Sequence, residues 1–278
     1  ILVFINYYGK KSETFISDEI EFLSSQKDID LTILHYGKDI TEKKVKGLYF
    51  ESNFIKRWLK AVRKFDVKMF AALRYKNGLN GSLVSLIPFF RKSKFDTIYC
   101  HFGTNGKLIA ELKELKVIPK ETKLVVRFHG LDMNFTKYPV GFYDILNNYA
   151  DEILLGSQFA YKNLRTYRLH KEKLNQLPVG IMRKNISKES SDFQPEQFNI
   201  ISVGRLIELK GYLVALDIIN EINKRSINFT YTIIGDGPQY DILSEVIERY
   251  TLQNKVKIIK GLDHANVLHL LQKSQIYL

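Results

Sequence analysis

Short apolar runs alternate along the chain with longer segments in which apolar residues recur at helical spacing. Residues 1–5 form an uninterrupted apolar run, which is typical of a strand buried on both faces of a parallel sheet. A helix is predicted to start at Ser12, because the next apolar residues share one helical face, namely Ile16, Ile20 and Leu23. Further strands are predicted at residues 30–35, 97–100, 124–128, 152–155 and 174–177, with helical patterns between most of them. The alternation predicts an α/β fold with a parallel sheet flanked by helices.

A polar, serine-rich segment at residues 184–197 interrupts this alternation, and we interpret it as a linker. The alternation then restarts, with strands predicted at residues 198–203, 229–234 and 256–259 and helices from about residue 211, through 244–250 and at 264–272. We therefore predict an N-terminal domain over residues 1–183, a linker over 184–197 and a C-terminal domain over 198–278. Because the chain begins and ends within apolar runs, we expect this second domain to be incomplete.

The composition is that of an ordinary soluble globular protein, with 45% hydrophobic and 26% charged residues. The apolar runs are all far shorter than the roughly 20 residues that a bilayer-spanning helix needs. Cys100 is the single cysteine of the sequence, which excludes an internal disulfide and a cysteine metal cluster and fits a reducing compartment.

The net charge of +12 is concentrated in residues 54–94, which contain 11 lysines and arginines and one acid, Asp66. The apolar residues of this basic segment fall on one helical face, namely Ile55, Trp58, Leu59, Val62, Met69 and Leu73. A basic amphipathic helix suits an anionic membrane surface, where each cation contributes about 1 kcal/mol. The sequence Phe89-Phe90-Arg91-Lys92, in the same segment, again places aromatic residues beside basic ones.

The alternative interpretation of residues 54–94 is a helix packed on the core with an ordinary solvated basic face. Nucleic acid is not expected as a partner, because the sequence has no zinc-finger spacing and no RNA-binding signature.

The first candidate for chemistry is the segment from Gly204 to Gly211, between a predicted strand and a predicted helix. Arg205 and Lys210 fall beyond the carboxyl end of the strand, where open α/β sheets bind their ligands. Two cations beside a glycine and a helix N-terminus suit a diphosphate. The alternative is a pair of solvated loop charges.

A second candidate, Gly235-Asp236-Gly237-Pro238, is again a glycine turn between a strand and a helix. It begins like a dinucleotide-binding fingerprint, but Tyr240 occupies the position of the third glycine. A nicotinamide enzyme would also carry this motif after the first strand of a domain, and neither domain does. A tight turn with a proline at the start of a helix is the alternative.

A third candidate is His129, at the end of a predicted strand in the sequence Arg127-Phe128-His129-Gly130-Leu131-Asp132. An imidazole there can donate a hydrogen bond or move a proton. His101, in His101-Phe102-Gly103, is a parallel case at another strand end. The alternative for both is a structural histidine.

Taken in order, these motifs resemble the retaining GT-B glycosyltransferases of family four, and the opening motif is most similar to the colanic-acid and exopolysaccharide branch. The resemblance covers essentially the whole chain. It rests on Ser12-Glu13-Thr14-Phe15-Ile16 with Glu19-Ile20, His101-Phe102-Gly103, His129-Gly130-Leu131-Asp132, Pro178-Val179-Gly180-Ile181, Gly204-Arg205 with Lys210-Gly211, and Gly235-Asp236-Gly237-Pro238.

The resemblance implies two Rossmann-like domains with parallel sheets facing a cleft, the first for the acceptor and the second for a nucleotide-diphosphate sugar. Arg205 and Lys210 match the pair that binds the donor diphosphate and stabilises the leaving group, a task that other glycosyltransferases give to a metal. No metal or other cofactor is therefore expected. His129 matches the histidine that contacts the donor sugar near the reacting carbon.

Further cleft residues follow from the same resemblance. Ser12 and Glu13, beside Gly9, belong to the loop that faces the diphosphate, and Lys260-Gly261-Leu262 lies where backbone groups meet the base. The remaining candidates are His101, Asp132, Gly204, Gly235 and Gly237.

Family members continue past Leu278 to a glutamate-rich loop that contacts the donor, so we expect the fragment itself to be inactive or nearly so. The function expected is transfer of a sugar to a lipid-linked or polysaccharide acceptor, at the cytoplasmic face of the membrane. A GT-B sugar-nucleotide epimerase and a non-catalytic scaffold subunit of a polysaccharide assembly complex are the alternatives. The donor base and sugar, the acceptor and the oligomeric state are not readable from the sequence.

Overall fold

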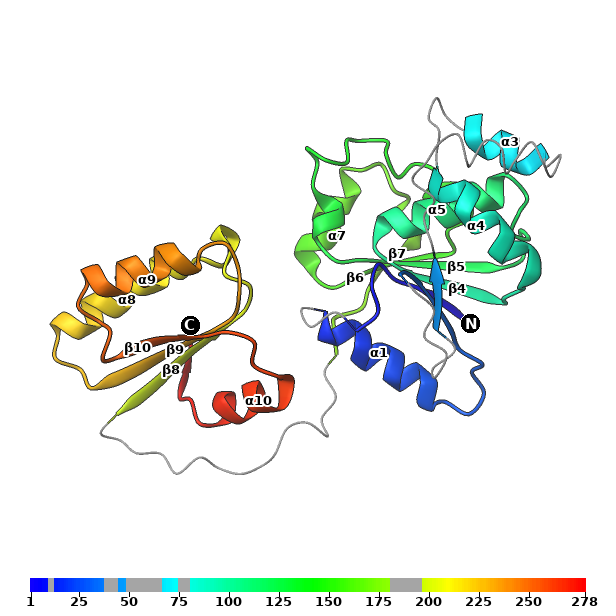
Figure 1. The fold of residues 1–278 in the computed structure, drawn as a ribbon. Coiled ribbons are helices and arrows are strands. Elements are labelled where there is room, and N and C mark those ends of the chain that lie inside the picture. Colours follow the sequence, from blue (N-terminus) through cyan, green and yellow to red (C-terminus); the bar gives the residue numbers. More distant parts are fainter. Residues whose placement is uncertain (10–12, 38–44, 49–66, 75–80, 181–196) are drawn as a thin grey trace. The chain divides into compact units, whose positions relative to one another are not determined.

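The computed structural model describes residues 1–9, 13–37, 45–48, 67–74, 81–180 and 197–278 (Figure 1). The chain divides into two compact units, Ile1–Ile181 and Met182–Leu278, called here the N-terminal and the C-terminal unit. Each unit has its own sheet. Apart from residue 197, the predicted linker lies outside the described residues.

The N-terminal unit is built on a seven-stranded sheet in the order β3-β2-β1-β4-β5-β6-β7, and every neighbouring pair is parallel. The strands are β1 (Leu2–Phe4), β2 (Thr32–Tyr36), β3 (Val45–Leu48), β4 (Thr97–His101), β5 (Lys123–Phe128), β6 (Glu152–Leu155) and β7 (Leu174–Gln176). This arrangement confirms the predicted parallel α/β fold.

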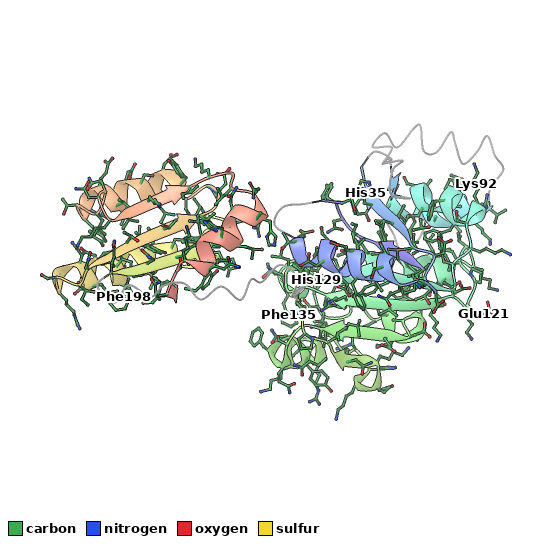
Figure 2. All side chains as sticks on the ribbon, turned by 90° about the horizontal axis from the view of Figure 1, so that it is seen from below. His35, Lys92, Glu121, His129, Phe135 and Phe198 are labelled. Carbon is green, nitrogen blue, oxygen red and sulfur yellow. The ribbon has the colours of Figure 1, made fainter. Side chains whose placement is uncertain are left out.

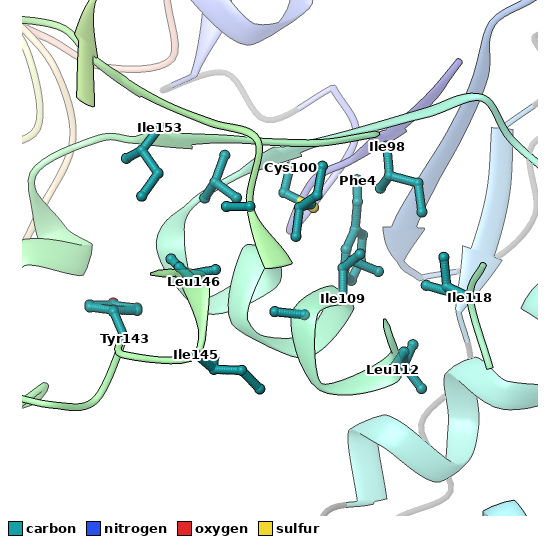
Figure 3. Close-up of a cluster of buried hydrophobic side chains, with 14 of the residues drawn as sticks. Phe4, Ile98, Cys100, Ile109, Leu112, Ile118, Tyr143, Ile145, Leu146 and Ile153 are labelled. Atoms are coloured by element: carbon teal, nitrogen blue, oxygen red, sulfur yellow. The ribbon is translucent and has the colours of Figure 1, made fainter. Parts of the chain in front are cut away.

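Helices cover both faces of this sheet, because successive residues of a strand point to opposite faces. Val3 and Ile5 pack under Ile16 and Ile20 of α1 (Thr14–Ser25). Leu2 and Phe4 face a larger core on the other side (Figure 3). The other helical segments of this unit are α3 (Val67–Arg74), α4 (Gly81–Lys92), α5 (Gly103–Glu114), α6 (Leu146–Tyr149), α7 (Gln158–Arg165), η3 (Leu131–Met133) and η4 (Lys171–Lys173).

The two ends of the parallel strands lie at opposite edges of the N-terminal unit. Figure 2 shows Glu121, just ahead of β5, at one edge and His129, just after β5, at the other. All strands run in the same direction, so the loops that carry candidate residues gather at the carboxyl edge with His129.

The described part of the basic segment packs on the core. Met69 and Ala72 of α3 are buried, and Phe90 of α4 is 6% exposed. Phe89 stacks on Phe95 and also meets the Phe90 ring. The Phe90 ring therefore belongs to the core and the Phe89 ring packs against it, as the alternative interpretation expects for this part of the segment. The predicted face from Ile55 to Val62 lies outside the described residues. None of the helices that the structure describes is both long enough and apolar enough to cross a membrane.

The C-terminal unit holds a four-stranded parallel sheet in the order β10-β9-β8-β11. Its helices α8 and α9 lie on one face of the sheet and α10 on the other (Figure 1). The core lies under α8 and α9 and includes Leu216, Ile219 and Leu243. The elements are β8 (Phe198–Val203), η6 (Glu208–Lys210), α8 (Tyr212–Lys224), β9 (Phe229–Ile234), α9 (Tyr240–Arg249), β10 (Val256–Ile259), α10 (His264–Gln272) and β11 (Ile276–Tyr277).

Candidate functional site

The loops that follow β8 and β9 are joined by backbone hydrogen bonds. Gly204 N–H donates to Ile234 O (2.9 Å), and Leu206 N–H donates to Asp236 O (2.9 Å). Gln239 N–H returns a bond to Leu206 O at 3.1 Å. The two glycine motifs therefore form one continuous backbone surface at the carboxyl edge of this sheet.

Two glycines are required by this close approach. A Cβ at Gly235 would lie 1.8 Å from Gly204 O, and a Cβ at Gly237 would lie 2.5 Å from Leu206 O. Both distances are far below van der Waals contact, so a side chain at either position would push the loops apart. The glycines of the second motif are thus explained by the close contact between the two loops.

Arg205 and Lys210 stand exposed on the first of these loops. The stem of Lys210 lies over Gly204, where an added Cβ would be 3.7 Å from Lys210 Cε. Gly211 follows in the left-handed conformation (φ 68°) and leads into α8. In the part of the chain that the structure describes, neither cation has a carboxylate within 4 Å. Two uncompensated charges beside a helix N-terminus attract an anion.

The loop after β10 lies beside the other two. Gly235 N–H donates to Ile259 O at 3.0 Å, so Lys260-Gly261-Leu262 begins next to the Gly235 turn. Lys260 Nζ lies 3.1 Å from the centroid of the Tyr240 ring, a cation–π contact between this loop and the start of α9. Gly261 is left-handed with φ 68°. The predicted residues of the C-terminal unit are therefore brought together at one edge.

At the carboxyl edge of the N-terminal unit, His101 and His129 form a pair. His101 Nδ1 lies 3.0 Å from His129 Nε2, and the two rings are nearly parallel, 5° apart. The His101 side chain is fully buried, whereas His129 is half-buried beside the rings of Phe15 and Phe102 (Figure 2). His101 thus lies behind His129, away from solvent.

Asp132 holds the loops that carry the two histidines. Its Oδ1 accepts the backbone N–H of His129 at 2.9 Å, and its Oδ2 accepts that of Gly103 at 2.8 Å. The carboxyl group is buried, and this desolvation raises the pKa of Asp132 although both N–H groups stabilise the charged form. Asp132 therefore holds the backbone in place at Gly103 and at His129.

A partly buried ion pair between Arg127 and Glu19 lies beside the histidines. Arg127 Nη1 donates to Glu19 Oε1 (2.9 Å) and Oε2 (3.1 Å), and the Tyr99 hydroxyl donates to Glu19 Oε1 at 2.7 Å. Arg127 Nη2 also donates to the carbonyls of Leu177 and Pro178. Glu19 Oε2 reaches within 3.9 Å of His101 Nε2.

Sequence reasoning assigned no role to Glu19, Tyr99 or Arg127. A signal for Glu19 was present, because it lies three residues after Ile16 and so on the buried face of α1. An acid on an apolar helical face needs a buried cation, and Arg127 supplies it.

The predicted loop at the start of α1 is described in part. Gly9 has φ 71°, and Glu13 takes the N-cap position of α1, so the helix begins at Thr14. Ser12 lies outside the described residues. Among the residues that are described, no three His, Cys, Asp or Glu side chains gather as a metal site would require.

Burial and charge keep both histidines neutral. Burial, with the nearby Arg127 guanidinium, lowers the pKa of His129 to about 4. Burial, His129 and Arg127 hold the pKa of His101 well below its usual value. At neutral pH the pair therefore carries no charge and can share one proton in its hydrogen bond.

The lowered pKa of His129 predicts a loss of stability in acid. Below about pH 6.5 the unfolded chain binds a proton at this histidine that the folded chain does not bind until pH 4, so folding weakens as the pH falls through that window. We expect the free energy of unfolding, measured with urea from pH 7.5 to 4.5, to fall less steeply in His129→Gln. Equal slopes for both proteins would contradict the assignment.

Parts of the chain are similar in sequence to known glycosyltransferases. Residues 183–278 match the family described as glycosyl transferases group 1. The chain is 29% identical over 173 residues to the putative colanic acid biosynthesis glycosyltransferase WcaL of Escherichia coli K12, covering 59% of this chain and 40% of WcaL. It is 28% identical over 230 residues to the amylovoran biosynthesis glycosyltransferase AmsK of Erwinia amylovora, covering 79% of this chain and 54% of AmsK. The chain therefore spans about half, or less, of the length of these relatives.

Solved structures share the fold at low sequence identity. The crystal structure of Anabaena HepE with UDP and glucose superimposes with a TM-score of 0.71 at 14% identity, covering 99% of this chain and 73% of HepE. That of TarM gives a TM-score of 0.68 at 11% identity, covering 99% of this chain and 79% of TarM. The two parallel sheets are those of GT-B glycosyltransferases. Residues 183–278 therefore match the glycosyl transferases group 1 family, and the chain is homologous to glycosyltransferases named for colanic acid and amylovoran biosynthesis.

Proposed function

We propose that the protein transfers a sugar from a nucleotide-diphosphate sugar to a lipid-linked or polysaccharide acceptor, with retention, in exopolysaccharide synthesis. The observation that carries the proposal is the pair of exposed, uncompensated cations Arg205 and Lys210 on the joined glycine loops. The relatives WcaL and AmsK, named for colanic acid and amylovoran biosynthesis, support an exopolysaccharide as the product.

The diphosphate of the donor would bind on the loop that contains Gly204. Arg205 can grip two phosphate oxygens with its planar guanidinium, and Lys210 adds a second positive charge over the same glycine. As the bond to the sugar breaks, negative charge grows on the leaving diphosphate, and fixed cations stabilise that charge. This role needs no divalent metal, and we propose that transfer is metal-independent.

His129 would serve the sugar end of the donor. It is the more exposed member of the histidine pair and is neutral at pH 7, so it can exchange a hydrogen bond with a sugar hydroxyl without adding charge. Loops at the carboxyl edge of the second sheet, including Lys260, would meet the nucleoside. HepE was crystallised with UDP and glucose, which makes UDP the first nucleotide to test.

Calorimetric titration of the complete protein with UDP, GDP and ADP, each with EDTA and without divalent metal, tests the proposal. We expect saturable binding of one nucleotide, which identifies the base, and no gain in affinity on adding Mg²⁺. A folded protein that binds none of the three would favour a scaffold role, and a strict need for Mg²⁺ would overturn the metal-independent reaction.

We further propose that the protein works at the cytoplasmic face of the membrane, attached through the basic segment 54–94. Its 11 cations against one acid predict binding to anionic vesicles that salt weakens, because surface charges are screened within about 10 Å at 0.1 M ionic strength. In flotation assays we expect retention on vesicles with anionic lipid at low salt, and release at 0.5 M NaCl. Equal recovery with neutral and anionic vesicles would contradict the proposed attachment.

A further inference from the structure

The two histidines at the carboxyl edge of the N-terminal unit differ in what surrounds them. His101 is fully buried, and its Nδ1 faces His129 Nε2 at 3.0 Å. A hydrogen bond between two neutral imidazoles contains one proton, so one of these nitrogens donates and the other accepts. His129 Nδ1 is the nitrogen left to face a ligand in either case, and the direction of this bond decides whether that Nδ1 accepts or donates a hydrogen bond.

The far side of His101 settles the direction of this bond. His101 Nε2 lies 3.9 Å from Glu19 Oε2, and it has no hydrogen-bond partner among the described residues. A bare Nε2 would point its lone pair at a carboxylate oxygen, whereas an N–H there is attracted to it. Arg127 and Tyr99 also lie near His101, but both donate hydrogen bonds to Glu19 and keep its carboxylate in place.

The proton of His101 therefore belongs on Nε2, which leaves Nδ1 as an acceptor. His129 then donates its Nε2–H to His101, and its own Nδ1 is unprotonated. Among the residues that the structure describes, His129 Nδ1 has no hydrogen-bond partner. It is the nitrogen of the pair that remains for a ligand.

We propose that His101 is a positioning residue that holds His129 in the Nε2–H tautomer, so that His129 Nδ1 accepts a hydrogen bond from a hydroxyl of the donor sugar. This inference rests on the proposed function. Asp132 has a different task, because its two oxygens accept backbone N–H groups and do not touch either ring. Asp132 fixes where the two loops lie, and His101 fixes how the His129 ring is protonated.

The tautomer can be read directly, without substrate. Long-range ¹H–¹⁵N correlation spectra of the complete protein labelled with ¹⁵N-histidine distinguish protonated from bare ring nitrogens. The His129 signals are those missing from His129→Gln. At pH 7.5 we expect Nε2 of His129 to be protonated and Nδ1 bare, and the opposite pattern would overturn the proposal even if no variant folds.

Removal of His101 supplies the second readout. In His101→Phe the acceptor is gone, so we expect both tautomers of His129 to be populated. We also expect kcat/KM for the donor to fall about tenfold, the effect of weakening one hydrogen bond to the sugar. The matched control is His35→Phe, a buried histidine of β2 whose ring lies beside that of Tyr8. It should leave the His129 signals unchanged.

The outcomes separate this inference from the proposed function. A wrong tautomer, or an unchanged kcat/KM in His101→Phe, overturns the positioning role and leaves glycosyl transfer standing. Absence of nucleotide binding by a protein with the expected tautomer instead removes the proposed function, and the role at the sugar with it.

Discussion

Replacing Arg205 and Lys210 together by alanine should abolish measurable binding of the nucleoside diphosphate that the protein prefers. Each charge-assisted hydrogen bond to phosphate contributes about 1.5–3 kcal/mol, so losing two predicts an affinity at least about 100-fold weaker. The fold should survive, because both side chains are exposed and neither is paired with a described carboxylate. Calorimetry at a fixed ionic strength of 0.15 M measures the affinity, and circular dichroism checks the fold.

A control variant removes the same charge from the opposite edge of the same sheet. Arg225 follows the C-terminal end of α8, and Lys273 follows that of α10, where helices return to the amino ends of the strands. Arg225→Ala with Lys273→Ala therefore lowers the net charge equally without touching the glycine loops. We expect it to bind the nucleotide as tightly as the unaltered protein. Similar losses in the two double variants would mean that overall charge, and no specific site, binds the diphosphate.

Several parallel strands could be predicted closely because each is a short segment rich in apolar and β-branched residues that stands between helical patterns. The strands at 152–155, 198–203, 229–234 and 256–259 begin and end as the sequence predicts. β3 (Val45–Leu48) was not predicted, because an edge strand that contains Lys46 and Gly47 has no apolar run. α9 begins at Tyr240, earlier than the predicted helix through 244–250, because the Pro238 turn leads directly into it.

The two halves of the candidate site differ in how far the sequence predicts them. The glycine loops are local in sequence, so Gly204, Lys210 and Gly235 can be recognised from the spacing of their motifs. The group behind His129 is assembled over long separations, since Glu19 and Arg127 are 108 residues apart. No local pattern encodes such a contact. His101 was singled out by its place at a strand end, but its role behind His129 follows from three-dimensional contacts alone.

The structure leaves no room for a side chain at Gly235. Gly235 does not have a positive φ, so alanine would fit its backbone conformation. What excludes alanine is the carbonyl oxygen of Gly204, 1.8 Å from the added Cβ, with Leu206 Cδ2 at 3.3 Å. The obstacle is backbone, which cannot rotate away as a side chain can, and the backbone bond from Gly204 N to Ile234 O ties the same loops together.

Gly235→Ala should therefore destabilise the C-terminal unit by about 3 kcal/mol or more, the range of severe overpacking. Because two units can unfold separately, hydrogen exchange of the amides in β8 and β9 is the appropriate measurement. Gly211→Ala is the control in the same unit, because an added Cβ there meets nothing within 4 Å but φ is 68°, which costs about 1 kcal/mol. If Gly235→Ala exchanged no faster than Gly211→Ala, the two loops would not be in contact, and the shared backbone surface proposed for the diphosphate would have to be abandoned.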